Sequence, residues 1–139
     1  MAIKTINPYL TFPGTAEKAI RHYESALGAK ADNIMRFGDM PGGDVPAEAK
    51  NRVMHCVLHI GSQVIMASDT RPGETPPPGG QVHISVDFDD EADMTKKFDA
   101  LAAGGKVTMP LADTFWGARF GMLVDAYGID WMFNCEKRK

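Results

Sequence analysis

Hydrophobic and polar residues follow the same order of patterns twice along the chain. Each copy opens with a strand-like run of period two, at residues 5–12 and 81–88. A helical segment follows each run and ends at residues 26–30 or 102–106. Further strand-like runs follow each helix, including residues 52–60 and 63–68 in the first copy and residues 118–124 and 130–134 in the second. The repeat predicts an α+β fold of two strand-helix-strand-strand-strand modules, with a ligand pocket between paired sheets.

Both helical segments carry an apolar stripe. The stripe comprises Ala16, Ala19, Ile20, Tyr23 and Leu27 in the first helix and Ala92, Phe98, Leu101 and Ala102 in the second. Thr15 is expected to cap the start of the first helix, and Gly28 to end it in a left-handed conformation. Asp89 or Asp90 is expected to cap the second helix, which ends at a Gly-Gly pair.

A segment rich in proline and glycine separates the two modules. Residues 70–80 cannot hold a helix or a central strand, so we interpret them as a linker. The length favours a single domain over residues 1–139. Within it we expect module 1 at about residues 4–69 and module 2 at about residues 81–135.

Composition and charge narrow the classes of function. Of the 139 residues, 44% are hydrophobic and 24% charged, as in ordinary globular proteins. A net charge of −3 without a basic block gives nucleic-acid binding little support. No apolar run reaches the length of a membrane span, and the N-terminus lacks a signal-peptide core. Cys56 and Cys135 show no ligand spacing, so we expect a reduced, cytoplasmic protein that buries both thiols and has no nucleic-acid or membrane partner.

Several motifs resemble one superfamily over nearly the whole chain. They are HYESALG at residues 22–28, DAYG at residues 125–128, and the runs at residues 8–10, 64–69, 105–111 and 114–121. Together with the repeat, they are similar to the vicinal oxygen chelate superfamily of glyoxalase I, bleomycin-resistance proteins and dihydroxybiphenyl dioxygenases. Within it they resemble the PhnB-like branch, often labelled 3-demethylubiquinone-9 3-methyltransferase. The resemblance implies two βαβββ modules with curved mixed sheets, and a homodimer.

The resemblance also places four positions at which the superfamily's metal enzymes hold an ion. Here they carry Asn7 or Pro8, Met66, Gln81 with His83 nearby, and Met132. Amides and thioethers suit a hard divalent ion poorly, so we expect no family metal and no cofactor. No glycine-rich loop follows a strand to hold S-adenosylmethionine, which leaves the methyltransferase label without support.

Three histidines are the basis for an alternative hypothesis, an atypical metal site. His55 and His59 share one face of a strand, and His83 is expected to point the same way. Residues four apart on a strand, however, are separated by about 13 Å, which is too far for both to bind one ion. The favoured interpretation is therefore a polar lining of a wet cavity or of a solvated sheet face.

Strand parity and the superfamily positions predict a ligand-binding surface. Its concave side is expected to comprise Tyr9, His55, His59, Met66, His83, Met132 and Asn134. Trp116 and Arg119 are expected near its rim, where an indole and an unpaired guanidinium would favour a planar anionic ligand. In the alternative, Trp116 anchors its loop and Arg119 forms a salt bridge. Trp131 and Phe133 alternate away from Met132 and are expected to pack beneath the helices.

Methionine is frequent, and its use has two interpretations. Met35, Met54, Met66, Met122 and Met132 are expected to contribute to a thioether-rich interior. Such an interior suits either an adaptable apolar cavity or an ordinary core.

The sequence favours a small-molecule binding protein without the superfamily's metal site. The alternative is an enzyme of lyase, isomerase or dioxygenase-like type. It would use an atypical metal site, or acid-base chemistry at His83 or His55. The sequence does not identify catalytic residues.

Overall fold

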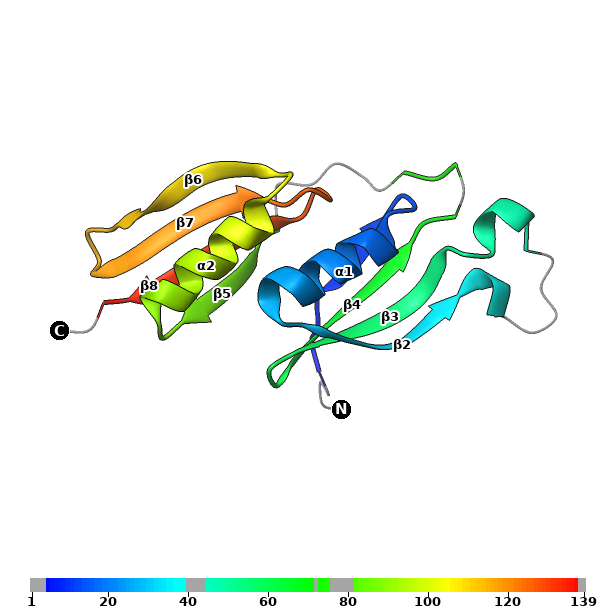
Figure 1. The fold of residues 1–139 in the computed structure, drawn as a ribbon, viewed down its shortest axis with the longest axis horizontal. Helices are drawn as coiled ribbons and strands as arrows, with labels where there is room; N and C mark the ends of the chain where they lie inside the picture. The colour runs from blue at the N-terminus through cyan, green and yellow to red at the C-terminus, as the bar shows by residue number, and fades with distance from the viewer. Residues whose placement is uncertain (1–4, 40–44, 72, 76–81, 138–139) are drawn as a thin grey trace. The chain divides into compact units, whose positions relative to one another are not determined.

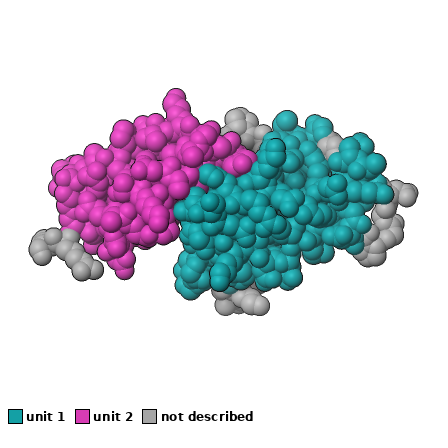
Figure 2. Space-filling model, in the orientation of Figure 1, with its two compact units in different colours: residues 1–77 teal, residues 78–139 magenta. Residues whose placement is uncertain are grey.

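The computed structural model describes residues 5–39, 45–71, 73–75 and 82–137. The chain divides into two compact units, Met1–Pro77 and Pro78–Lys139, which Figure 2 shows in different colours. In each unit one helix lies across one face of a four-stranded sheet (Figure 1). Within the described part of the chain, neither helix is long and apolar enough to cross a membrane.

Unit 1 contains the first module. Its elements are β1 (Tyr9–Phe12), α1 (Ala16–Leu27), β2 (Lys30–Arg36), the short 3₁₀ helices η1 (Phe37–Asp39) and η2 (Ala47–Ala49), β3 (Val53–Ile60) and β4 (Gln63–Asp69). The strands lie in the order β1-β4-β3-β2. β1 runs parallel to β4, whereas the other neighbours are antiparallel, so the sheet is mixed.

Unit 2 repeats this arrangement. Its elements are β5 (Ile84–Phe88), α2 (Glu91–Ala102), β6 (Lys106–Asp113), β7 (Ala118–Val124) and β8 (Asp130–Glu136). The order β5-β8-β7-β6 and the parallel pairing of β5 with β8 match unit 1. Tyr23 in α1 and Phe98 in α2 are buried at 1% and 3% exposure, each on the sheet-facing side of its helix. The predicted α+β fold of two βαβββ modules with mixed sheets is confirmed.

A buried carboxylate holds the start of α1 in place. The expectation that Thr15 caps this helix is wrong, because its side chain makes no capping hydrogen bond. Instead, Oδ1 of Asp69, at the end of β4, accepts hydrogen bonds from the backbone N–H groups of Gly14 and Ala16 at 3.0 and 2.8 Å. Its Oδ2 accepts from the N–H of Val53 at 2.9 Å. Asp69 therefore ties the helix N-terminus to two strands.

The other helix ends follow the sequence pattern. Gly28 ends α1 in the left-handed conformation at φ 74°, as predicted. Asp90 caps α2 by accepting a hydrogen bond from the N–H of Asp93 at 3.1 Å. Beneath α2, Phe133 is fully buried and meets Phe98 edge to face at 5.5 Å. Trp131 is also buried, which confirms the prediction for both β8 residues.

Candidate functional site

Each sheet has a second face, which its own helix does not cover. In unit 1, the strand register places Tyr9 beside Met66 and Met66 beside Val57, so these side chains share a face. Leu58 and Ile65 alternate to the helix side and are 0% and 6% exposed. We call the side opposite α1 the first open face; it carries Tyr9, Met35, His55, Val57, His59 and Met66.

Tyr9 and His55 form a hydrogen-bonded pair on the first open face. The Tyr9 hydroxyl lies 3.2 Å from Nδ1 of His55, and the two rings are 5.8 Å apart at 39°. Because β4 separates β1 from β3, the pair reaches across one intervening strand. Tyr9 is 48% exposed. Among the described residues, no protein group is hydrogen-bonded to the Nε2 atom of His55, so this nitrogen can contact a ligand.

The second histidine of this face has a different partner. Nε2 of His59 lies 3.5 Å from Oδ2 of Asp32 on β2, and both side chains are about half exposed. His55 and His59 are therefore engaged with separate groups. Within the part of the chain that the structure describes, no three His, Cys, Asp or Glu side chains are grouped to hold one metal ion.

Unit 2 has an equivalent second open face. The register places Asp87 beside Asn134 and Met122 beside Met132, and Phe120 also lies beside Asn134. Nδ2 of Asn134 donates a hydrogen bond to Oδ1 of Asp87 at 3.3 Å. Met132 and Asn134 thus lie on the face opposite α2, on the side that parity predicted.

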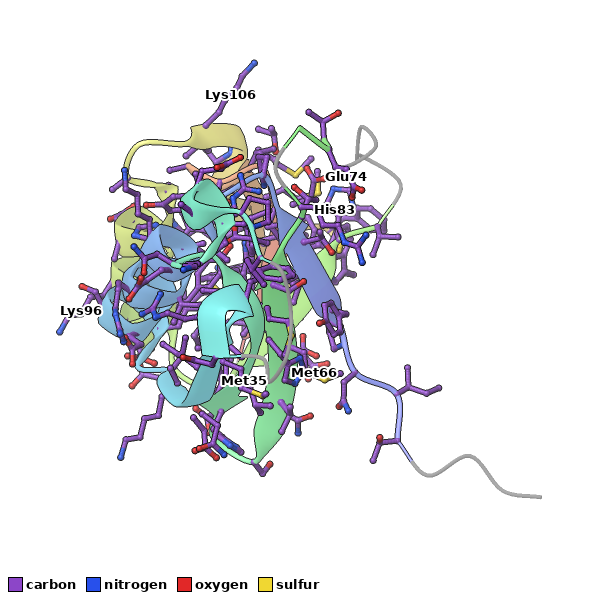
Figure 3. The ribbon with its side chains drawn as sticks, turned by 90° about the vertical axis from the view of Figure 1, so that its right-hand side faces the viewer. Met35, Met66, Glu74, His83, Lys96 and Lys106 are labelled. Carbon is purple, nitrogen blue, oxygen red and sulfur yellow. The ribbon has the colours of Figure 1, made fainter. Side chains whose placement is uncertain are left out.

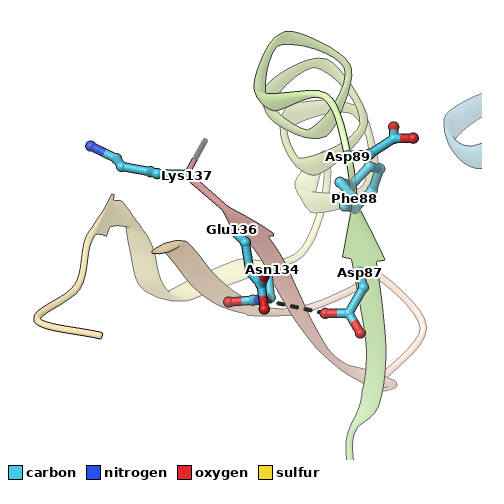
Figure 4. A pocket seen from close by; sticks show the side chains of 6 residues that line it. All are labelled: Asp87, Phe88, Asp89, Asn134, Glu136 and Lys137. Atoms are coloured by element: carbon cyan, nitrogen blue, oxygen red, sulfur yellow. Dashed lines mark hydrogen bonds between the residues drawn. The ribbon is translucent and has the colours of Figure 1, made fainter. Parts of the chain in front are cut away.

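A shallow pocket borders the second open face (Figure 4). It has a volume of about 480 Å³ and is lined by Asp87, Phe88, Asp89, Asn134, Glu136 and Lys137. Three carboxylates face one ammonium group in this lining, so an anionic ligand would meet net repulsion there.

Trp116 lies against an aromatic side chain of the second open face. It occupies the β6–β7 turn, is 56% exposed, and meets Phe120 at 6.0 Å and 69°. The neighbouring Phe115 is 97% exposed and meets Trp116 at 5.0 Å. Sequence reasoning missed Phe120, although its parity with Met122 on one strand would have revealed it.

The expectation of an unpaired Arg119 is wrong. Arg119 is in register with Cys135, on the α2 side of the sheet rather than the side of Met132. Its guanidinium lies 3.3 Å from Asp113 and 3.6 Å from Glu91. The alternative, a structural salt bridge, is confirmed. Lys137, with Arg119 as a weaker contributor, lowers the pKa of the Asp113 carboxyl, so this network joins β6, β7, α2 and the residue that follows β8.

The structure also describes most of the other residues that the sequence singled out. His83 is half-buried and precedes β5 by one residue, whereas Gln81 lies outside the described residues. Met35 and Met66, labelled with His83 in Figure 3, lie on the first open face rather than in a buried interior. Among the described methionines only Met94 is buried, so the predicted thioether-rich interior is wrong.

Cys56 and Cys135 are buried as expected, and burial raises the pKa of the Cys56 thiol.

Comparison with known proteins agrees with this fold. The family model of the Glyoxalase/Bleomycin resistance protein/Dioxygenase superfamily matches residues 5–133. The chain therefore belongs to this superfamily.

Relatives place it near the PhnB-like branch. Protein YjdN of Escherichia coli strain K12 is 32% identical over 146 residues, covering 96% of this chain and 97% of that protein. The crystal structure of PA1353 from Pseudomonas aeruginosa matches with a TM-score of 0.86 at 40% identity, over 98% of this chain and 100% of that one. The PhnB protein from Bacillus cereus matches with a TM-score of 0.77 at 27% identity, over 95% and 99% of the two chains.

Proposed function

We propose that this protein binds a small organic molecule at its first open face, with Tyr9 and His55 as the principal polar contacts. The observation that carries the proposal is the 3.2 Å contact between the Tyr9 hydroxyl and Nδ1 of His55, on the face opposite α1. Each group can donate or accept a hydrogen bond, depending on the tautomer of the imidazole. The pair therefore offers a ligand one phenol oxygen and one ring nitrogen in a fixed relation.

The surroundings favour a flat, partly apolar ligand. The Tyr9 ring supplies a planar surface. The thioethers of Met66, beside Tyr9, and of Met35, beside His55, are flexible and polarisable, so they adapt to ligand shape. Separately, within unit 2 alone, we propose His83, Trp116, Met132 and Asn134 as ligand contacts. Arg119 is excluded from the proposal because Glu91 and Asp113 already neutralise it. The ligand therefore does not need an anionic group for that arginine.

We further propose that ligand binding does not use the superfamily's divalent metal. The donors at the corresponding positions do not fit a hard ion. The Asn7 amide donates to Oγ1 of Thr5 at 3.3 Å, and Met66 and Met132 supply only thioethers. Treatment with a chelator is expected to leave ligand affinity unchanged.

A metal-free acid-base enzyme is the second candidate function. The Tyr9–His55 hydrogen bond favours it, because a phenol and an imidazole in contact can pass a proton to or from a bound substrate. Turnover of a bound compound, with a rate that follows the ionisation of one imidazole and is lost in His55→Gln, would establish this candidate. Binding without chemical change of the ligand would support the binding protein.

The proposal extends to the oligomeric state and the cellular location of the protein. We propose a cytoplasmic homodimer, since proteins of this family usually pair and a closed twofold dimer is the commonest assembly of soluble chains. Sedimentation equilibrium at micromolar concentration is expected to give twice the chain mass of 15.1 kDa. A mass near that of one chain would contradict the dimer.

The ligand is to be found by a thermal-shift screen. The panel should contain planar metabolites and antibiotics, both neutral and anionic, because Arg119 does not give the site a preference for an anionic ligand. Compounds that raise the melting temperature of the wild type and not of Tyr9→Phe/His55→Gln would identify ligands of this face. Hits that stabilise both proteins equally would place binding elsewhere and contradict the proposed site.

A further inference from the structure

Three methionines stand in one row across the sheet of unit 2. Met109 on β6 is the register partner of Met122 on β7, and Met122 is the register partner of Met132 on β8. Met109 is 44% exposed, and Met122 and Met132 are partly exposed. The thioether row, as we call these three residues, therefore consists of three partly exposed methionines in register on neighbouring strands, with a register shift on either side of Met109.

We propose that the thioether row binds a soft monovalent cation, Cu(I). Thioether sulfur is a neutral, polarisable donor that selects soft ions such as Cu(I) over Zn²⁺, Mg²⁺ or Ca²⁺. Three such donors side by side supply the soft ligand set that this ion prefers. The described residues group no three His, Cys, Asp or Glu side chains that would favour a harder ion.

The spacing of the row suits a shared ion. Neighbouring strands lie about 4.8 Å apart, and directly opposed side chains have Cβ atoms roughly 4.5–5.5 Å apart. Met122 is central, so Met109 and Met132 need only lean inward from either side. The methionine side chain is unbranched, with three rotatable bonds, and can make this adjustment without moving the backbone.

Aromatic rings lie beside the middle of the row. Phe120 is two residues from Met122 on the same strand and therefore on the same face. Trp116 meets Phe120 at 6.0 Å, and both faces of an indole or phenyl ring attract cations. The site belongs to unit 2 alone and does not depend on Tyr9 or His55, but it shares Met132 with the ligand contacts proposed for unit 2, and Trp116 borders it.

Silver(I), which resists oxidation and reduction under assay conditions, is the probe for the first experiment. The full chain is labelled with ¹³C in the methionine methyl groups and titrated with Ag(I) in chloride-free buffer. Three of the nine methionine signals are expected to shift together and to saturate at one Ag(I) per chain. Met→Leu substitutions at residues 109, 122 and 132 assign these signals. Silver uptake without methionine shifts, through the thiols of Cys56 and Cys135, would overturn the proposal.

Competition for Cu(I) with a coloured chelator then measures affinity. Met122→Leu preserves apolar volume and is expected to weaken Cu(I) binding by at least about tenfold. Met35→Leu is the matched control, because Met35 is also 44% exposed but lies on the sheet of unit 1. Circular dichroism confirms that both variants fold. Equal Cu(I) affinity in Met122→Leu and wild type, or an equal loss in Met35→Leu, would overturn the proposed site.

Discussion

The Tyr9 hydroxyl and Nδ1 of His55 lie 3.2 Å apart, although β4 separates their strands in the sheet. The contact engages Nδ1 of the imidazole, which leaves Nε2 as the nitrogen that can serve a ligand. A half-exposed phenol and an imidazole thereby become one polar group on a largely apolar face. This pairing distinguishes the first open face from the second, where Ser85 and Phe120 stand at the positions of Tyr9 and His55 in the register.

Removing the Tyr9 hydroxyl tests its contribution to binding. Tyr9→Phe is expected to weaken a ligand of the first open face about fivefold, because one hydrogen bond is worth about 1 kcal/mol. Stability should change by less than about 0.5 kcal/mol, since Tyr9 is 48% exposed. Isothermal titration measures the affinity. Tyr127→Phe, which removes the same group from the β7–β8 turn, serves as the control and should bind like the wild type. A wild-type affinity in Tyr9→Phe would show that the Tyr9 hydroxyl does not contribute to ligand binding.

Asp69 is predicted to carry much of the stability of unit 1. Its carboxylate accepts three backbone hydrogen bonds while 6% exposed. Asp69→Asn replaces one acceptor oxygen by an NH₂ group that faces backbone N–H donors. The free energy of unfolding should fall by about 2–4 kcal/mol, measured by urea denaturation. Asp99→Asn, on the exposed side of α2, should change it by less than about 0.5 kcal/mol. Equal effects of the two substitutions would refute the role of Asp69.

The ion pair between Glu17 and Arg36 predicts a loss of stability in acid. Two hydrogen bonds of 2.9 Å join these side chains, and the Arg36 guanidinium lowers the pKa of the Glu17 carboxyl. Because the folded pKa lies below the unfolded value of about 4.3, the contribution is complete above that pH. It is lost as the pH falls through the folded pKa.

Arg36→Gln measures this contribution. The stability difference between wild type and Arg36→Gln should be largest near pH 7 and shrink below about pH 4. Lys96→Gln is the control, because Lys96 points into solvent in Figure 3 and should show a small difference at every pH. Denaturant titrations at a series of pH values give both curves. A difference for Arg36→Gln that is independent of pH would show that the ion pair is not its source.

The central elements of each module were predictable from sequence because their patterns are strong. Residues 53–60 and 63–69 form strands where alternation and a turn predicted them, and the start of β7 at Ala118 agrees as well. The edge strands β2 and β6 were not located. β6 is exposed along almost its whole length and has two register shifts, so its apolar residues show no clean alternation.

Residues of the candidate site were predictable only where alternation along a single strand determined which face of the sheet a side chain occupies. Parity placed Tyr9, His55 and Met66 together, because β1, β4 and β3 pair without register shifts. Arg119 was misplaced because its partner Glu91 comes from an element distant in sequence, and its partner Asp113 lies on β6, which was not located. The cap of α1 was missed for the same reason, since Asp69 lies far along the chain from the helix that it holds.

The central proposal is that a ligand binds at the first open face without a metal ion. The most direct measurement is the dissociation constant of the best ligand from the screen, by isothermal titration of chelator-treated wild type and chelator-treated Tyr9→Phe/His55→Gln. We predict that treatment leaves the wild-type value unchanged and that the double substitution raises it at least about tenfold. Loss of wild-type binding on chelation that Zn²⁺, Mn²⁺ or Ni²⁺ restores, or equal binding by the double variant, would contradict the account.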